Sequence, residues 1–453
     1  MDYFNVSGLV KRRPLILYLL KTYPRSSVFW VAFIFVLSAG LTIQLLLLPS
    51  VSSLHAGHGL LKGGDWVWFH EEAAAIARKM LNGGWSAWNL RASGNTPIGL
   101  TAALYFVTGI YEPWLVLPVN AFFFALSTLF LYELAALLTE QPLAKLLATL
   151  PFLCFFSAAT IYGQIHKDVF SIAGVLLVVL SLGYLVRLGE IDRSSVLTIL
   201  GLISVACVLV WSVRPYLLLI LFVGGVSGLA LVCAIWGRSR TRLWWLAILF
   251  STLILCAGAG TNFLPNAPRN PIAFQLRPMQ PISPTGGSWI ENKILGFVLS
   301  IDYSRQGFSD PAGSNIDTQV RLDSIGSLLA YLPRAVQIGV LAPFPNSWLS
   351  SSSQPGGAMM RTVSAFEMAV SYVLLVGLIF GLLRQKWRNP VLWIVLYLTL
   401  FFILLQALAI PNVGALYRMR YGAWQLLNAL GVIGFVYLYQ DLKQFVRRSK
   451  SIR

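Results

Sequence analysis

About ten long apolar runs decide what this chain can fold into. A helix needs roughly 20 apolar residues, within a range of about 17–25, to cross the hydrocarbon core of a bilayer. The runs that reach or approach this length are Val28–Leu48, Trp114–Leu138, Leu146–Tyr162, Val169–Val186, Val196–Val213, Tyr216–Trp236, Leu243–Phe263, Met368–Leu383, Val391–Ile410 and Trp424–Leu438. The sequence therefore predicts an all-α, polytopic integral membrane protein with about ten transmembrane helices.

The composition agrees with a membrane protein and argues against a soluble nucleic-acid-binding protein. Only 11% of the residues are charged and 57% are hydrophobic, whereas soluble domains carry roughly 25% charged residues. A net charge of +17 would suggest nucleic-acid binding in a soluble protein. Here most basic residues fall in short loops between apolar runs, where such residues set membrane topology. We therefore expect the membrane, and no nucleic acid, as a partner.

The basic loops also predict the orientation. With both termini in the cytoplasm of a bacterial inner (plasma) membrane, the Lys- and Arg-rich short loops all lie on the cytoplasmic side, as the positive-inside rule requires. The segment Ile98–Ile110 is too short to cross and carries Gly99 and Gly109, which favours a re-entrant or interfacial helix. The cytoplasmic residues are Lys11, Arg12, Arg13, Lys21, Arg25, Lys145, Arg187, Arg193, Arg238, Arg240, Arg242, Arg384, Lys386, Arg388 and the tail Lys443–Arg453.

Two long outer segments divide the chain. We predict a transmembrane module over residues 1–261, whose first outer loop (49–113) contains interfacial helices and an active site. Residues 262–366 form a long extracytoplasmic loop between spans seven and eight, and residues 367–453 supply the last spans. The long loop begins Pro-rich, which excludes a regular helix there. Its later part, Ile316–Leu341, has the apolar spacing of an amphipathic helix lying on the membrane surface.

The unusual polar residues gather on the outer side. A charged side chain at bilayer depth costs at least about 2.5–3.5 kcal/mol of insertion free energy, so charges near the ends of spans indicate a functional or structural role. Arginines facing one outer cavity are suited to phosphate, which a planar guanidinium binds through two parallel hydrogen bonds. The residues concerned are Asp65, His70, His166, Lys167, Asp168, Arg214, Arg418 and Arg420. The four cysteines lie in apolar runs without a C-x-x-C pair, so neither disulfides nor a zinc site are expected.

A family resemblance gives these residues roles. The stretch D-W-V-W-F-H-E-E-A-A-A-I-A-R-K-M-L-N-G-G-W, followed by N-T-P-I-G-L-T-A-A-L-Y-F-V-T-G-I-Y, resembles the first outer loop of GT-C glycosyltransferases. These membrane enzymes use polyprenyl- or dolichyl-phosphate-linked sugars, and the similarity covers about residues 25–235. The C-terminal half, with N-V-G-A-L-Y-R-M-R-Y, looks like membrane proteins of bacterial polysaccharide loci.

The resemblance implies an inverting transfer of a sugar from a polyprenyl-phosphate donor to a glycan or lipid acceptor, in cell-envelope or exopolysaccharide synthesis. Asp65 corresponds to the acidic residue that acts as base or substrate anchor in the first outer loop. The G-Q-I-H-K-D stretch is similar to a second acidic loop and assigns a catalytic role to Asp168. A requirement for a divalent cation stays open. The other roles are donor phosphate binding by Lys167, Arg214, Arg418 and Arg420, and sugar or acceptor contact by Trp66, Trp68, His70 and His166.

Other interpretations remain open. Asp65 is also suited to begin a helix or to sit in a turn beside Gly64, and the tryptophans are also typical of an interfacial belt. Lys167 and Asp168 suit an ion pair at the end of a span. A polysaccharide polymerase or ligase would use a lipid-pyrophosphate donor and similar arginines. A lipid-linked glycan transporter or a non-catalytic assembly subunit is a further alternative, although a transporter should carry charges deep within its spans.

Overall fold

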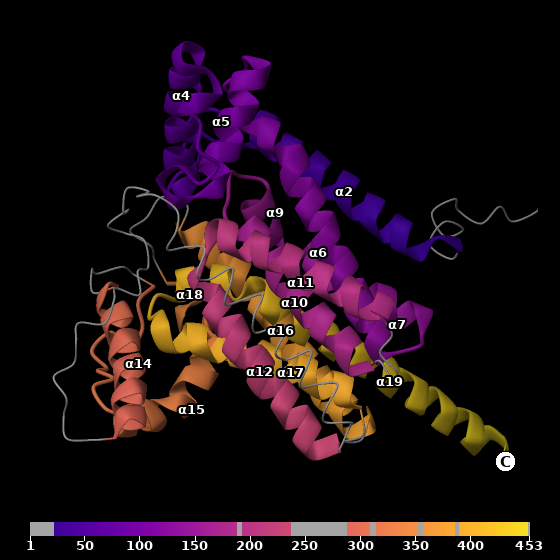
Figure 1. Ribbon diagram of the computed structural model, residues 1–453. Helices are drawn as coiled ribbons and strands as arrows, with labels where there is room; N and C mark the ends of the chain where they lie inside the picture. Colours follow the sequence, from indigo (N-terminus) through magenta and orange to yellow (C-terminus); the bar gives the residue numbers. More distant parts are fainter. Residues whose placement is uncertain are drawn as a thin grey trace, which may run out of the picture.

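The computed structural model describes residues 22–187, 193–236, 288–308, 314–350, 357–385 and 389–451. In this part of the chain, eight helices are long and apolar enough to cross a membrane, and they lie roughly side by side in one bundle (Figure 1). The protein is thus an all-α, multi-pass membrane protein, as predicted. The spans contain α2 (Pro24–Thr42, continued by η1, Ile43–Leu47, and α3, Leu48–Ser50), α6 (Leu117–Leu138, preceded by η4, Pro113–Val116), α10 (Asp168–Arg187), α11 (Arg193–Val213), α12 (Tyr216–Trp236), α16 (Gly357–Gln385), α17 (Pro390–Ala409) and α19 (Tyr421–Ser451).

The predicted span Leu146–Tyr162 is not one straight helix. It is divided into α7 (Pro142–Leu147), α8 (Leu150–Cys154) and α9 (Phe156–Tyr162), and the chain bends by 64° between α8 and α9. Phe155 has an extended backbone at the bend. The amide of Ser157, which lacks an intrahelical partner so close to the start of α9, donates to the carboxyl of Glu367 (2.6 Å). The predicted span Leu243–Phe263 and the Pro-rich stretch lie outside the described residues.

Small residues bring helices of the bundle into close contact. Helix α10 is the most buried of the spans and packs against α6, α11, α17 and α19. Helices α16 and α19 meet at Gly377, Gly431 and Gly434, where an added Cβ would collide with the facing backbone, and at Gly381, where it would be in tight contact with Gly434. Close backbone approach through glycine is a common way to pack helices where lipid removes the hydrophobic driving force.

The segment predicted as the first outer loop (49–113) forms a small helical unit of its own, called the first outer segment below. Helix α4 (Asp65–Gly83) packs against α5 (Thr96–Thr108), with the short turns η2 (Gly84–Ala87) and η3 (Ala92–Gly94) between them. Its apolar core includes Phe69, Ile98 and Tyr105. Helix α5 has 13 residues and is too short to cross a bilayer, in line with the expectation for Ile98–Ile110.

The second outer segment contains α14 (Trp289–Gln306), α15 (Ile325–Leu341) and the turn η5 (Pro345–Ser347). The amphipathic helix predicted from Ile316 begins only at Ile325. The reason is the capping box at Ser324, whose hydroxyl accepts from the Ser327 amide and so fixes the start of the helix there. The preceding residues instead form an isolated bridge, Asn315 with Asn412, that joins this segment to α18 (Val413–Met419).

Candidate functional site

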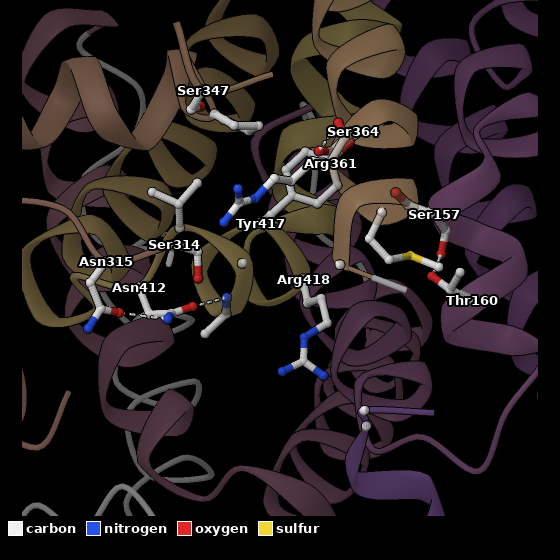
Figure 2. A pocket seen from close by; sticks show the side chains of 18 of the residues that line it. Ser157, Thr160, Ser314, Asn315, Ser347, Arg361, Ser364, Asn412, Tyr417 and Arg418 are labelled. Atoms are coloured by element: carbon white, nitrogen blue, oxygen red, sulfur yellow. Dashed lines mark hydrogen bonds between the residues drawn. The ribbon is translucent and has the colours of Figure 1, made fainter. Parts of the chain in front are cut away.

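A cavity of about 650 Å³ lies between the two outer segments. One wall is formed by Leu61–Trp66, by α9 and by His166; the other is formed by residues 343–347, the first turns of α16, and α18. Figure 2 shows Arg361 of α16 and Arg418 of α18 directed into this space. The helices α9 and α18, which contribute to its lining, lie toward the end of the bundle opposite α7 and the C-terminus of α19 (Figure 1).

Asp65 reaches the cavity from the first turn of α4. Gly64 precedes it, and a Cβ at this position would collide with the ring of Trp66, so the approach to the helix requires glycine. The Asp65 side chain is 50% exposed, and its carboxylate lies 3.8 Å from the Lys167 ammonium. A carboxylate at a helix N-terminus is also stabilised by the helix dipole. The site therefore contains an accessible carboxylate held in place by a lysine.

Asp168 and Arg214, both predicted to act on substrate, are bound to each other. Arg214 Nε donates to Asp168 Oδ1 at 2.9 Å, and Arg214 Nη2 donates to the same oxygen. Arg214 Nη1 donates to the Tyr216 hydroxyl at 2.7 Å. The Asp168 side chain is 1% exposed, and the ion pair lies behind the cavity rather than in its wall. Breaking such a buried pair costs about 3–5 kcal/mol, so its evident effect is to fix the start of α10.

The ion pair orients His166, which does line the cavity. The backbone amide of Asp168 donates to His166 Nδ1 at 3.1 Å, so the neutral ring carries its hydrogen on Nε2. Burial lowers the pKa of His166, which keeps the ring neutral at physiological pH. His166 Nε2 lies 3.4 Å from Arg418 Nη1. Two hydrogen-bond donors thus face each other at the cavity wall, an arrangement that suits an anionic oxygen accepting from both.

Lys167 connects these groups. Burial, and then the nearby charge of Arg214, lower the pKa of its ammonium. Its Nζ lies 6.0 Å from the centre of the Phe69 ring and faces Asp65 as described above. Lys167 therefore stabilises the position of the Asp65 carboxylate, the predicted base.

Arg420 has a different environment from Arg418. Its side chain is buried, and Nη1 donates to the carbonyl of Ile338 (3.1 Å). The same guanidinium donates to the carbonyls of Gly339 and Ala342, near the C-terminal end of α15 where carbonyls lack helical partners. It also lies over the ring of Trp424. Arg420 thus holds α15 in place and does not line the cavity.

Of the residues predicted to contact sugar or acceptor, some line the cavity and others do not. Trp66 lines the cavity and donates its indole N–H to the Leu61 carbonyl. Trp68 packs against the core of the first outer segment. His70 is buried there, with Nδ1 2.8 Å from the Tyr105 hydroxyl. The cavity therefore brings together Asp65, Trp66, His166 and Arg418, with Lys167, Asp168 and Arg214 beside them, while Trp68, His70 and Arg420 lie elsewhere.

The sequence analysis missed two features of the site. Arg361 lines the cavity from α16, but the sequence analysis placed it in the long loop 262–366, where nothing sets it apart from other basic residues. Glu367 is fully buried and accepts hydrogen bonds from the Ser157 amide and the Tyr417 hydroxyl. A carboxylate at the edge of a predicted span is costly, and that signal was available for Glu367.

The residues at the site do not fit a divalent cation. The two predicted catalytic carboxylates, Asp65 and Asp168, face Lys167 and Arg214. In the part of the chain that the structure describes, no three His, Cys, Asp or Glu side chains come together as a metal site. We therefore derive no step through a metal.

Comparison with known proteins identifies the fold. No family model matches the chain, and no curated protein matches it. Among solved structures, it is similar to the oligosaccharyltransferase AglB from the archaeon Archaeoglobus fulgidus, in complex with an inhibitory peptide and a dolichol-phosphate. The TM-score is 0.52 at 11% identity, over 95% of this chain and 52% of that chain, so this chain spans about half the length of AglB. At this identity the likeness shows the fold alone.

Proposed function

We propose that this protein is a membrane glycosyltransferase that transfers a sugar from a polyprenyl-phosphate-linked donor to a glycan or lipid acceptor at the outer cavity. The observation that carries the proposal is the meeting of Asp65, His166 and Arg418 at one cavity, on a fold similar to that of AglB. A carboxylate beside two donors directed at an anion is the arrangement that transfer from a sugar phosphate needs.

The chemistry would proceed in one displacement with inversion at the anomeric carbon. Asp65 accepts the proton of the acceptor hydroxyl while its oxygen forms a bond to the anomeric carbon. The bond between that carbon and the phosphate oxygen breaks, and the phosphate leaves with the electron pair. Arg418 and His166 Nε2–H stabilise the charge that develops on the leaving phosphate.

The solved AglB complex contains a dolichol-phosphate, which supports a lipid-linked donor for a protein of this fold. We extend this to a cavity on the extracytoplasmic face of a bacterial inner membrane and to a role in cell-envelope or exopolysaccharide synthesis. Both extensions rest on the basic loops and the sequence resemblance.

Replacing the proposed base tests the function. We expect Asp65→Asn to lower transfer from a radiolabelled polyprenyl-phosphate sugar to membrane acceptors by at least about 100-fold, the usual lower contribution of a general base. Asparagine keeps the shape of the side chain, so the amount of protein in the membrane should not change. The measurement is the incorporation of label in membranes containing equal amounts of each variant.

Glu71→Gln is the matched control, because Glu71 is an exposed carboxylate on the same helix, α4. It should transfer label at the wild-type rate. Full transfer by the Asp65→Asn variant would remove Asp65 from the mechanism.

A further inference from the structure

The first outer segment is attached to the C-terminal end of helix α11 at two points. The Thr96 hydroxyl donates to the carbonyl of Ser212. Close by in the chain, the guanidinium of Arg91 lies over the indole ring of Trp211, 4.7 Å from its centre. A guanidinium is attracted to the face of a tryptophan ring, so this stack holds the Arg91 charge at the junction between the outer segment and the bundle.

The charge of Arg91 is not offset. Within the described part of the chain no carboxylate pairs with Arg91, and its buried Nε has no hydrogen-bond acceptor. Burial lowers the pKa of Arg91. Residues 237–287, the longest stretch outside the described part, contain no Asp or Glu and so supply no carboxylate either. Because a half-buried charge without a counter-ion is costly, an anion from outside the chain would stabilise this arrangement.

A second donor without a partner belongs to the same stack. Trp211 Nε1 is buried and has no hydrogen-bond acceptor among the described residues, although a buried indole N–H usually finds one. A charged donor and a neutral donor are thus left unsatisfied at one place. An anionic group with several oxygens, such as a phosphate, is suited to accept from both.

The surroundings of the stack are those of a lipid headgroup. Trp211 lies in the last turn of α11, one of the membrane spans, and tryptophans near the ends of spans lie at the membrane–water interface. Val208, one turn earlier and on the same side of α11, is 62% exposed, and Leu90, next to Arg91, is 40% exposed. A phosphate at the stack would therefore have its acyl chains beside an exposed apolar face.

We propose that Arg91 and Trp211 bind the phosphate of an anionic glycerophospholipid from the leaflet nearer the cavity. An anionic lipid fits better than a zwitterionic one, because its headgroup brings no cation of its own to compete with Arg91 for the phosphate. Neither residue lines the cavity. The site is thus separate from that of the proposed transfer reaction, and the inference does not rest on the proposed function.

The test measures the binding of single lipids to the full chain in detergent by native mass spectrometry. The probes are phosphatidylglycerol and phosphatidylcholine with identical acyl chains. We expect Arg91→Gln to bind phosphatidylglycerol about tenfold more weakly than the wild type, the lower end of what the loss of a hydrogen bond to a charged group costs. Its affinity for phosphatidylcholine should change less than about twofold, since the headgroup cation already pairs with that phosphate.

Two further variants separate lipid binding from a structural role of the stack. Arg91→Lys keeps the charge and should retain part of the preference for phosphatidylglycerol. Trp211→Phe keeps an aromatic ring under Arg91 but removes the N–H, and it should lose part of the preference. Equal losses of affinity for both lipids in Arg91→Gln would mean that the variant only displaces the outer segment, and would overturn the proposal.

Arg78→Gln is the matched control. Arg78 belongs to α4 of the same outer segment, and its guanidinium also lies over an aromatic ring, 5.7 Å from the centre of Tyr111, but its side chain is exposed. This variant removes the same charge and should keep the wild-type affinities. A loss of phosphatidylglycerol binding as large as that of Arg91→Gln would show that overall charge, and not this site, attracts the lipid.

Polyprenyl monophosphate serves as a third probe, because it is the other lipid phosphate that the protein is expected to meet. Arg91→Gln should leave its affinity unchanged. A loss equal to or greater than that for phosphatidylglycerol would assign the site to the sugar carrier and overturn the assignment to a glycerophospholipid. No transfer reaction enters these measurements, so they fail or succeed independently of the assay on Asp65→Asn.

Discussion

Arg418 and Arg420 show what residue-level reasoning could and could not establish. Successive residues of a helix are separated by about 100°, so two residues two positions apart point about 200° apart. Only one of the pair could face a given cavity, but the sequence does not say which. The structure places Arg418 in the cavity wall and Arg420 beneath α15. Arg420 is drawn there by backbone carbonyls at the C-terminal end of α15, which lack helical partners. These carbonyls lie about 80 residues earlier in the chain.

His166 shows a second limit of prediction from the sequence. The family resemblance implied that it contacts sugar or acceptor. Which of its nitrogens carries the hydrogen depends on the backbone amide of Asp168 in the same loop, which donates a hydrogen bond to His166 Nδ1 at 3.1 Å. In that tautomer the Nε2–H lies beside Arg418 as a second donor at the cavity wall, and no pattern of residue types encodes it.

The buried neutral ring of His166 predicts a dependence of stability on pH. Burial lowers the pKa of His166 in the folded protein, whereas the unfolded chain has the ordinary value near 6.5. Below about pH 6.5 the unfolded chain therefore binds a proton that the folded protein does not, so the contribution to stability is complete above this pH and is lost as the pH falls further. We expect the thermal unfolding midpoint of the purified protein to decrease between pH 7 and pH 5.

His166→Gln is the comparison for this measurement, because glutamine retains a donor in place of Nε2–H and does not titrate. The decrease should be smaller in this variant than in the wild type. Identical decreases in the two proteins would mean that His166 takes no part in the acid sensitivity.

At the scale of the helices, hydropathy predicted the position of most spans but not the bend between α8 and α9. The run Leu146–Tyr162 is apolar enough to span, and Phe155 does not differ in type from its neighbours. What permits the bend is a carboxyl from another helix, Glu367 of α16, which accepts from the Ser157 amide and from the Tyr417 hydroxyl. A single side chain thus joins α9, α16 and α18, three helices that line the cavity.

Replacing Glu367 should therefore damage the fold and the cavity together. Glu367→Leu leaves the Ser157 amide and the Tyr417 hydroxyl buried without this partner, at about 1–3 kcal/mol each. We expect a lower unfolding temperature and reduced sugar transfer. Glu367→Gln, which keeps an oxygen acceptor, should recover most of the stability. Equal stability of the Leu and Gln variants would show that the hydrogen bonds of Glu367 do not support the bend.

At the scale of the whole molecule, the sequence predicted two long outer segments but not that they face each other. Leu61–Trp66 and residues 343–347 are nearly 280 positions apart, and no local pattern relates them. Their meeting depends on packing within the bundle, including the close approach of α16 and α19 at glycines. It also depends on the bridge from Asn315 to Asn412, with its side-chain hydrogen bond of 2.7 Å.

The opposite end of the molecule has the charge pattern of a cytoplasmic face. Arg25 pairs with Glu133, Arg187 with Glu140 and Arg384 with Asp441. A hydrogen bond between Gln141 and Gln440 joins α19 to the connection between α6 and α7. Basic residues in short connections are retained in the cytoplasm during insertion. Since the spans run between the two ends, this assignment would place the cavity outside the cytoplasm.

Cysteine labelling tests this orientation in intact cells, in a background from which Cys154, Cys207, Cys233 and Cys256 have been removed. Ser53→Cys in the first outer segment and Leu349→Cys in the second are both at exposed positions. A membrane-impermeant maleimide should label both without permeabilisation. Ser449→Cys, exposed near the end of α19, should react only after the membrane is opened. Labelling of Ser449→Cys in sealed cells, with Ser53→Cys protected, would place the cavity in the cytoplasm, where a donor displayed on the outer leaflet cannot reach Asp65.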